Sequence, residues 1–257
     1  MISIIIPTLR ITEEEIIRQL ESLILQNREC ELIFSHGEYQ GFQIHIQTIS
    51  DMLADTNISF KVIQNPQTHT ILSRAESMNL AAEKASGDIL LFLHLDCFLP
   101  PHALHSIDVT MKNPNYIAGG FLKRYDRAFF CRLTEKVLNY RSKTAKRLVG
   151  TNAIFVRKSV FKDKPFPNQF MEDVAFSDNL LENYSKTSIV IIDDPVIVSA
   201  VKYGQNNGWK RILINACVMI LHRVYKVRHE ELEKLYKSGN KKSISALVKE
   251  SCRLKKS

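Results

Sequence analysis

Residues 73–96 read SRAESMNLAAEKASGDILLFLHLD, and this run gives the clearest indication of the architecture. Small apolar residues recur in its first half near helical spacing, at Ala75, Met78, Ala81, Ala82 and Ala85. This pattern predicts an amphipathic helix over 73–85, closed by Gly87. The apolar run that follows predicts a buried strand over 89–94. A helix leading into a strand that is apolar on both faces is typical of a parallel sheet covered by helices.

The same alternation extends through the chain in both directions. Apolar runs at 3–7, 31–34 and 60–64 predict three more strands, and Thr12 with Glu15 has the capping-box spacing that opens a helix to about Gln26. Further on we expect strands over 117–125 and 151–156 and paired or bent strands over 189–192 and 196–200. We expect helices over 102–112, 129–142, 172–183, 208–225 and 230–256, the last range divided in two by a break at Gly239-Asn240. The predicted fold class is α/β, a mostly parallel sheet with helices on both faces and a helical C-terminal extension.

Composition places the chain among ordinary globular proteins. Its 257 residues are 45% hydrophobic and 24% charged, which excludes disordered and fibrous classes. The formal net charge is +8, and residues 202–257 hold 14 Lys and Arg against 4 Asp and Glu. The basic excess therefore belongs to the C-terminal segment, so we divide the chain into a main domain, 1–201, and a basic helical extension, 202–257.

Cysteine usage and the apolar runs indicate the compartment. The five cysteines are widely spaced and form no C-x-x-C pair, so they predict neither a disulfide framework nor a zinc site. No basic segment precedes the first apolar run, and no run reaches the roughly 20 residues that span a bilayer. We expect a cytoplasmic protein, at most peripheral at the inner face of a membrane.

Polar residues directly follow three of the predicted strands. In an open parallel sheet, ligands bind beyond the carboxyl ends of the strands. Each segment alone has a structural explanation, as a strand end, a turn or a loop cap, but together they are expected to line one edge. The segments are Pro7-Thr8-Leu9-Arg10, His36-Gly37-Glu38 and His94-Leu95-Asp96.

Asp96 carries the sharpest chemical signal of this edge. A carboxylate at the end of a buried strand is costly to desolvate unless it binds a cation or hydrogen-bond donors. Mg²⁺ or Mn²⁺ bridging diphosphate oxygens would satisfy it, because Mg²⁺ is commonly held by one or two carboxylates and substrate phosphates. We favour a core role for His94, two residues earlier, over a ligand role.

The run 73–96 resembles the donor-site segment of family 2 glycosyltransferases of the GT-A fold. Within the family it is similar to a small bacterial branch in which histidine replaces the first Asp of the D-x-D motif. Met171-Glu172-Asp173-Val174 resembles the family's acidic base motif, and residues 150–157, GTNAIFVR, resemble the acceptor-side strand that precedes it. The resemblance extends from Ile2 to about Leu235.

This resemblance implies a nucleotide-diphosphate-sugar donor, a hydroxyl acceptor, with a lipid-linked one among the candidates, and metal-assisted transfer with inversion. It implies that Asp96 holds the metal-diphosphate and that Asp173 is the general base, with Glu172 positioning the acceptor. The donor-binding residues that it implies are Pro7, Thr8, Arg10, His36, Arg74, Asn79, His94 and Lys202. His36 stands where the family usually has an Asp that contacts the base, Arg10 replaces an Asn or a Glu pair, and Thr151-Asn152-Ala153 replaces a Gly-Asp-Gln-like triplet.

Elementary electrostatics supports the assignment of the acidic pair. Glu172 and Asp173 open a predicted helix, where the helix dipole stabilises negative charge, and their mutual repulsion is expected to raise one pKa. An inverting transfer needs one carboxylate to take the acceptor proton and a cation to stabilise the leaving diphosphate. A doubly acidic first turn is also a common structural feature.

Other functions fit the sequence less well. A nucleotidyltransferase or a dinucleotide enzyme needs a glycine-rich loop after the first strand, and residues 7–11 contain no glycine. Nucleic-acid binding is not expected, because aromatic residues do not interleave with the basic residues of the extension. A catalytically altered GT-A protein that binds nucleotide sugars or a membrane surface is the alternative from another class.

The extension itself permits two interpretations. Its Lys and Arg side chains and apolar faces are typical of a basic amphipathic surface that rests on anionic lipid. The apolar residues can equally pack on the main domain and leave the cations solvated, and we favour this interpretation slightly. Its apolar residues are Leu232, Leu235, Tyr236, Ile244, Leu247, Val248 and Leu254.

Overall fold

A computed structural model describes residues 1–8, 12–37, 45–65, 71–126, 129–201, 208–225 and 227–238. Eight strands occur in these ranges, and each predicted strand is among them. They are β1 (Ile2–Thr8), β2 (Cys30–His36), β3 (Ile58–Gln64), β4 (Ile89–Phe92), β5 (Cys97–Phe98), β6 (Ala118–Tyr125), β7 (Ile154–Arg157) and β8 (Ile189–Val198).

All eight strands belong to one sheet in the order β3-β2-β1-β4-β7-β6-β8-β5. The pairs β3·β2, β2·β1, β1·β4 and β6·β8 are parallel, whereas β7 is antiparallel to both its neighbours and β5 is antiparallel to β8. The mostly parallel sheet expected from the sequence is confirmed. The antiparallel strand β7 divides it into an N-terminal half and a C-terminal half.

Helices connect the strands and cover both faces of the sheet. They are α1 (Glu13–Ile24), α2 (Ile46–Leu53), α3 (Arg74–Lys84), α4 (Ala103–Met111), α5 (Phe129–Ala145), α6 (Lys158–Asp163), α7 (Glu172–Asn183), α9 (Gly208–Tyr225) and α10 (His229–Ser238). The capping box of Thr12 with Glu15 is present, and Ser73 with Glu76 forms a second one at α3. The short helices α2 and α6 were not predicted.

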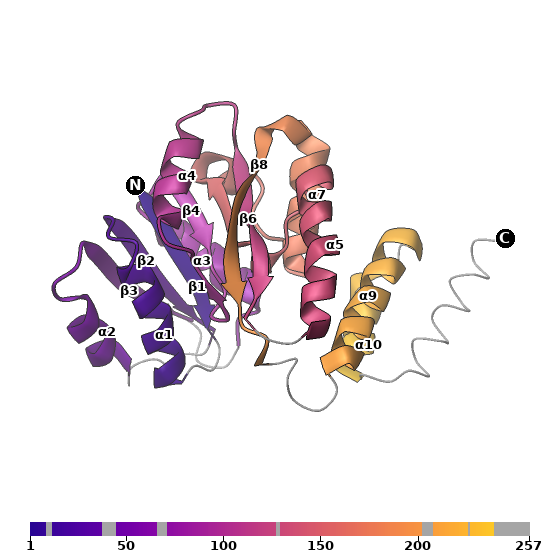
Figure 1. Cartoon of the computed structure of the whole chain (residues 1–257), viewed down its shortest axis with the longest axis horizontal. Helices are drawn as coiled ribbons and strands as arrows, with labels where there is room; N and C mark the ends of the chain where they lie inside the picture. The colour runs from indigo at the N-terminus through magenta and orange to yellow at the C-terminus, as the bar shows by residue number, and fades with distance from the viewer. Residues whose placement is uncertain are drawn as a thin grey trace.

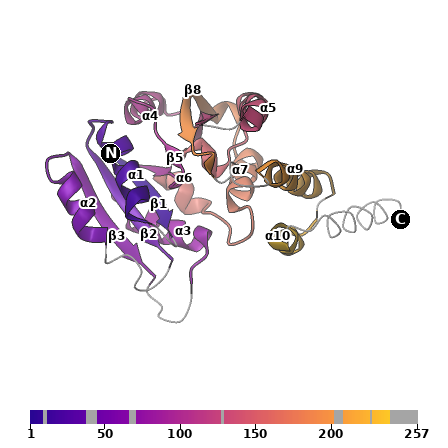
Figure 2. The same ribbon diagram turned by 60° about the horizontal axis from the view of Figure 1, so that its bottom comes forward.

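Alternate residues of the strands face two separate apolar cores. Ile4 and Ile6 of β1 lie in the core under α1, α2 and α4, whereas Ile5 lies in the core under α3, α6 and α7. Both cores are closed to solvent, and burying one such side chain stabilises the fold by about 1.5–3 kcal/mol. Figures 1 and 2 show α9 and α10 at the opposite end of the molecule from α2 and β3.

Three local predictions need correction. The strand expected over 89–94 ends at Phe92, because a turn closed by the Cys97 N–H to the His94 carbonyl redirects the chain into β5. The strand expected from Thr151 begins at Ile154, after a 3₁₀ turn over Gly150–Asn152. The two segments expected over 189–200 form the single strand β8, which carries a register shift against β6.

Gly87 has a different role from the predicted one. The helix α3 ends at Lys84, and Ala85 is already extended, so Gly87 does not close it. A Cβ on Gly87 would lie 2.7 Å from both the Met1 carbonyl and the Ser3 hydroxyl. The residue is glycine because the backbone of β1 lies directly against it, and its N–H donates to Ser3 Oγ over 2.8 Å.

The helices α9 and α10 form a small apolar cluster of their own against the main sheet domain. Leu232 and Leu235 of α10 are fully buried with Val218 and Leu221 of α9, and Phe170 and Met171 pack against them. These leucines therefore face protein and not lipid, as the packing interpretation expects. Residues 239–257 lie outside the described ranges. Within those ranges, no helix combines the length and the hydropathy needed to cross a membrane.

Candidate active site

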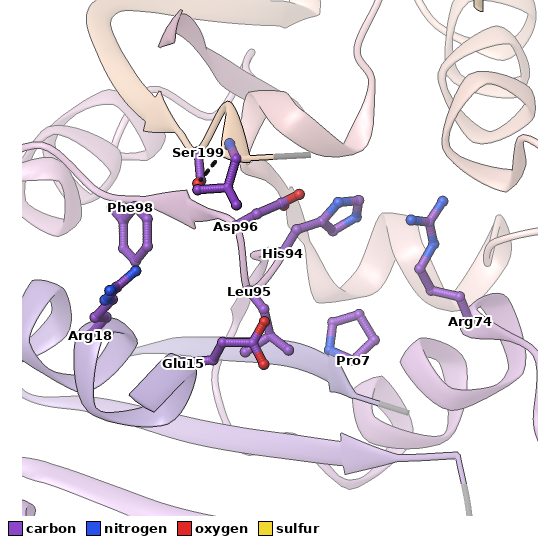
Figure 3. Close-up of a pocket in the computed structure, with 10 residues that line it drawn as sticks. Pro7, Glu15, Arg18, Arg74, His94, Leu95, Asp96, Phe98 and Ser199 are labelled. Carbon is purple, nitrogen blue, oxygen red and sulfur yellow. Dashed lines mark hydrogen bonds between the residues drawn. The ribbon is translucent and has the colours of Figure 1, made fainter. Parts of the chain in front are cut away.

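A cavity of about 490 Å³ lies beyond the carboxyl ends of β1 and β4. Its lining comes from both halves of the sheet, and nine of the residues are labelled in Figure 3. The predicted residues Pro7, Arg74, His94 and Asp96 line it, so the structure brings four of the expected donor-side residues together. The other lining residues are Glu15, Arg18, Leu95, Phe98, Ser199 and Val201.

Asp96 lies in the turn directly before β5, whereas the sequence predicted it at the end of β4. Its backbone carbonyl accepts a hydrogen bond from the Ser199 N–H over 2.8 Å, directly after β8. Its Oδ1 lies 3.7 Å from the Cys97 thiol. Figure 3 shows its carboxylate directed into the same space as the His94 ring. Strand pairing with β8 therefore positions the carboxylate, and the buried-strand argument for its desolvation does not apply.

Arg74 is the first residue of α3 and connects the two acidic parts of the site. It forms a charge-assisted hydrogen bond to Glu172, the first residue of α7. Burial acts to lower the pKa of Arg74, but Glu172, Asp173 and Asp96 together raise it. One guanidinium thus contacts Glu172 of the predicted base motif and lines the same cavity as Asp96, the predicted metal ligand.

Glu172 and Asp173 differ in their surroundings. Glu172 is buried, and burial raises its pKa, with a further contribution from Asp173 and an opposing one from Arg74. The raised pKa expected for one member of the pair therefore belongs to Glu172, the buried carboxyl. Asp173 is half-buried, and its Oδ2 accepts the Gly150 N–H over 2.6 Å while its Oδ1 accepts the Val174 N–H over 2.8 Å.

The turn over Gly150–Asn152 fits between the two ends of the site. The His94 ring lies so close to Gly150 that a Cβ there would overlap it. Behind the turn, the buried ammonium of Lys123 on β6 donates to Thr151 Oγ1 over 2.6 Å. Burial, with a smaller effect from Arg141, lowers the pKa of Lys123 to about 8. The turn therefore couples His94, Asp173 and a buried lysine.

Two other predicted residues lie behind the cavity rather than in its lining. Thr8 and His36 are opposite one another in the β1·β2 register, both are buried, and Thr8 Oγ1 lies 3.0 Å from His36 Nδ1. The Gly37 N–H donates to the Thr8 carbonyl over 2.9 Å. These contacts hold the ends of β1 and β2 together, and a role of either residue in donor binding stays a prediction.

Asn79 uses its amide to hold the chain that leads to α7. Its Nδ2 donates to the Phe166 carbonyl over 2.8 Å, and its Oδ1 accepts the Phe166 N–H over 3.1 Å. Both polar atoms are thus bound to one backbone unit, away from the cavity lining. Arg10 and Lys202, predicted to bind the donor, lie outside the described residues.

Sequence reasoning missed Glu15 and Arg18 of α1 and the buried Lys123. Glu15 and Arg18 are three positions apart, so they share one helix face, and that spacing was the available signal. Lys123 is a charged residue inside a strand whose other residues are mostly apolar, with a side chain only 2% exposed. A charge at such a position marks a functional or network role.

Comparison with known proteins agrees with this geometry. The sequence profile described as glycosyl transferase family 2 matches residues 3–163. The comparison with curated proteins gave no match. Among solved structures, the mannosyltransferase PcManGT from Pyrobaculum calidifontis, in complex with GDP-Man and Mn²⁺, is 14% identical with a TM-score of 0.63, over 98% of this chain and 75% of that one.

Two further structures share the fold. Residues 1–349 of S. aureus TarS are 17% identical with a TM-score of 0.58, over 91% of this chain and 69% of that one. Glucosyl-3-phosphoglycerate synthase from Mycobacterium tuberculosis, with Mn²⁺, UDP-Glc and phosphoglyceric acid, is 14% identical with a TM-score of 0.51, over 75% of this chain and 69% of that one. With the profile covering more than half of its length, the chain belongs to glycosyl transferase family 2, and its fold is GT-A.

Proposed function

We propose that this glycosyltransferase moves a sugar from a nucleotide-diphosphate donor to a hydroxyl acceptor with inversion, with Asp173 as general base. The observation that carries the proposal is the position of Arg74. It lines the cavity together with Asp96 on the donor side and forms an ion pair with Glu172, the neighbour of Asp173, on the acceptor side. A donor bound near Asp96 and an acceptor bound near Asp173 would therefore both lie close to the Arg74 guanidinium.

The reaction needs one base and one leaving group. The acceptor oxygen attacks the anomeric carbon as the bond from that carbon to the diphosphate oxygen breaks, and the acceptor proton passes to Asp173. The Gly150 and Val174 N–H groups hold the Asp173 carboxylate in a fixed orientation at the N-terminus of α7. Glu172 and Arg74 position the first turn of this helix, because their ion pair joins α7 to α3.

The residues present fit a divalent ion that the donor helps to hold. Among the described residues, no three His, Cys, Asp or Glu side chains converge on one point as a protein cage for a metal would require. Asp96 offers one carboxylate to the cavity, which suits Mg²⁺ or Mn²⁺ with diphosphate oxygens and water as the remaining ligands. Such an ion, when bound, neutralises charge on the leaving diphosphate.

The ligands bound in similar structures support a nucleotide-sugar donor. PcManGT was solved with GDP-Man and Mn²⁺, and S. aureus TarS was solved with UDP and with UDP-GlcNAc. These proteins differ in the nucleotide, so they favour the donor class and not one base. The alternative of a membrane-surface module without catalysis is weaker, because it gives no role to Asp96 and Asp173, and Leu232 and Leu235 of the extension are buried in protein.

A thermal-shift panel tests the proposal. UDP, GDP, CDP and dTDP sugars are added with and without Mn²⁺ to the parent, to Asp96→Ala and to the control Asp55→Ala, which removes an exposed carboxylate after α2. A nucleotide sugar held at 100 times its dissociation constant should add about 2.7 kcal/mol of stability. We expect the Mn²⁺-dependent part of this shift in the parent and the control and its loss in Asp96→Ala. The proposal fails if no nucleotide sugar shifts the parent, and the metal assignment fails if Asp96→Ala matches it.

A further inference from the structure

The turn over residues 169–171 leads into α7 and is held by the C-terminal extension. His229, the first residue of α10, contacts this turn at two points. Its Nδ1 lies 2.7 Å from the Phe170 carbonyl oxygen, and its Nε2 lies 3.2 Å from Nε2 of the Gln169 amide. Because a carbonyl oxygen only accepts hydrogen bonds, Nδ1 carries the proton and Nε2 accepts from Gln169. One imidazole therefore binds both the backbone and a side chain of the turn.

Apolar contacts between the extension and the turn accompany these hydrogen bonds. The ring centroids of Phe170 and Tyr236 lie 5.3 Å apart, a separation at which aromatic pairs attract one another. Phe170 and Met171 also pack against the apolar cluster that α9 and α10 form. A substitution of His229 therefore removes the polar part of this contact and leaves the apolar part in place.

Met171 transmits the position of the turn to α7. It is the N-cap residue of α7 and lies in the left-handed region, with φ 63° and ψ 44°. A residue with a side chain seldom adopts this conformation, which persists where the surrounding contacts determine it. The Met171 carbonyl accepts the Ala175 N–H over 3.0 Å and so closes the first turn of the helix. Glu172 and Asp173 lie in that turn, so the direction of both carboxyl groups depends on Met171.

A second contact fixes the body of α7 against the extension. Arg223 Nη1 of α9 lies 3.0 and 2.8 Å from the two oxygens of Asp178, in the middle of α7. Figure 2 shows α9 beside α7 and α10 next to α9. Because Arg223 holds the middle of the helix independently, loss of the His229 contact should disturb the first turn of α7 and leave the rest of the helix in place.

We infer that His229 is a positioning residue for the transfer reaction: through the Phe170 carbonyl and Met171 it sets the first turn of α7, and with it the Asp173 carboxylate. The inference rests on the proposed function, because it takes Asp173 as the base. The contacts are continuous from His229 to Phe170, through the cap of α7, and from Asp173 Oδ2 to the Gly150 N–H. The family profile ends at residue 163, so this contribution comes from outside the matched segment.

Kinetics of three variants test the positioning role. His229→Ala removes both hydrogen bonds, and His229→Asn keeps an N–H donor in place of Nδ1. Lys234→Ala, which removes an exposed cation from the same helix, is the control. Turnover is measured with Mn²⁺ and saturating donor as the release of nucleoside diphosphate, with water as the acceptor, from the nucleotide sugar that gives the largest thermal shift.

A displaced base should slow the reaction without changing donor binding. We therefore expect kcat of His229→Ala to fall about tenfold or more, while the Kd for the donor, measured by calorimetry, stays that of the parent. His229→Asn should recover most of the lost turnover, and Lys234→Ala should match the parent. Parental turnover of His229→Ala would overturn the inference.

Amide hydrogen exchange measures the same coupling without a substrate. The Ala175 N–H binds the Met171 carbonyl, and the Gly150 N–H binds the Asp173 carboxylate. Both should exchange faster in His229→Ala than in the parent, because their acceptors move when the turn is released. A purely structural role of His229 would raise exchange only in α9, α10 and the turn itself, and exchange confined to those segments would also overturn the inference.

Asp173→Asn separates a failure of this inference from a failure of the proposed function. If Asp173→Asn loses turnover and His229→Ala keeps it, the base assignment stands and the positioning role is wrong. If the parent turns over no nucleotide sugar, the proposed function fails. Faster exchange at Ala175 and Gly150 in His229→Ala would then still establish the link from His229 to the Asp173 carboxylate.

Discussion

The backbone N–H of Gly150 donates a hydrogen bond to Oδ2 of Asp173 over 2.6 Å. A Cβ on the same glycine would overlap the His94 ring. One residue without a side chain therefore sets the distance between the donor-side histidine and the carboxylate proposed as base. This relationship makes Gly150 a sensitive position for activity.

Gly150→Ala should lower turnover by at least about tenfold, because the new methyl group overlaps the His94 ring and displaces either the ring or the N–H that holds Asp173. Initial rates at saturating donor measure the effect. The double variant Gly150→Ala/His94→Ala makes room for the methyl group, so its melting temperature should recover relative to the single variant. Parental turnover in Gly150→Ala would show that this contact does not position the base.

Asp173→Asn keeps the shape of the side chain and removes its basicity, so turnover should fall by about 10² or more while donor affinity stays nearly constant. Asp163→Asn, at an exposed position of α6, is the matched control. Steady-state kinetics together with donor calorimetry separates the two effects. Normal turnover of Asp173→Asn would assign the base to another residue.

A double-mutant cycle measures the coupling free energy of the Arg74–Glu172 ion pair, and we expect it to be stabilising. Arg74→Gln leaves a buried carboxyl without its cation, and we expect a loss of about 2 kcal/mol at pH 7, reduced from the value for a fully buried pair because Arg74 is 47% exposed. Arg74→Gln/Glu172→Gln should recover most of it. Additive losses in chemical denaturation would contradict the coupling.

The pH dependence of the same variant has a definite sign. The folded-state pKa of Glu172 is raised above its ordinary value of 4.5, so its contribution to stability is present below that pH and is lost as the pH rises through the folded-state pKa. Without Arg74 the carboxyl becomes harder to ionise. The deficit of Arg74→Gln should therefore be small near pH 4 and increase toward pH 7, and a deficit independent of pH would argue against a buried charge.

Glu31 provides the opposite pH dependence, away from the site. Its carboxylate accepts hydrogen bonds from Ser3 and Ser86, and Lys61 Nζ lies 2.5 Å from its Oε1. Burial acts to raise the pKa of Glu31, but these partners lower it to about 2. Its contribution is present above pH 4.5 and is lost as the pH falls toward 2. Glu31→Gln should cost about 2 kcal/mol at neutral pH, measured by urea unfolding.

The cost of Glu31→Gln should fall to a small remainder when unfolding is measured near pH 2, because Glu31 of the folded parent is then about half protonated. Glu83→Gln, on the exposed face of α3, should change little at either pH. A loss that persists unchanged at low pH would mean that Glu31 acts through packing and not through its charge.

Local signals predicted much of this fold, because the features that start helices and bury strands lie close together in the sequence. The capping box of Thr12 with Glu15 correctly placed the start of α1, and the helical spacing of apolar residues over 73–85 correctly placed α3. The end of β4 was misplaced because Leu93 and Leu95 continue the apolar pattern, while the turn at His94 that ends the strand depends on β5 and β8.

The order of the motifs in the sequence predicted that Arg74, Asp96, Glu172 and Asp173 belong to one site. It did not predict the contacts between these residues. Arg74 and Glu172 are 98 positions apart, and no periodicity reports a pair at that separation. Tertiary packing buries Glu172 and thereby distinguishes it from Asp173. Tertiary packing also places the Asn79 amide where it hydrogen-bonds to the Phe166 backbone. Short motifs could therefore identify candidate residues, but they could not show which of them take part in the reaction and which hold the structure of the site.

The hydrogen bond from the Ser199 N–H to the Asp96 carbonyl limits how this enzyme can be recombined with its relatives. The family profile ends at residue 163, so a chimera that exchanges only the matched segment inherits Asp96 without the strand β8 on which it rests. It also separates Arg74 from Glu172, its partner on α7. An exchange that is meant to keep both contacts must therefore transfer β8 and the start of α7 together with the N-terminal half.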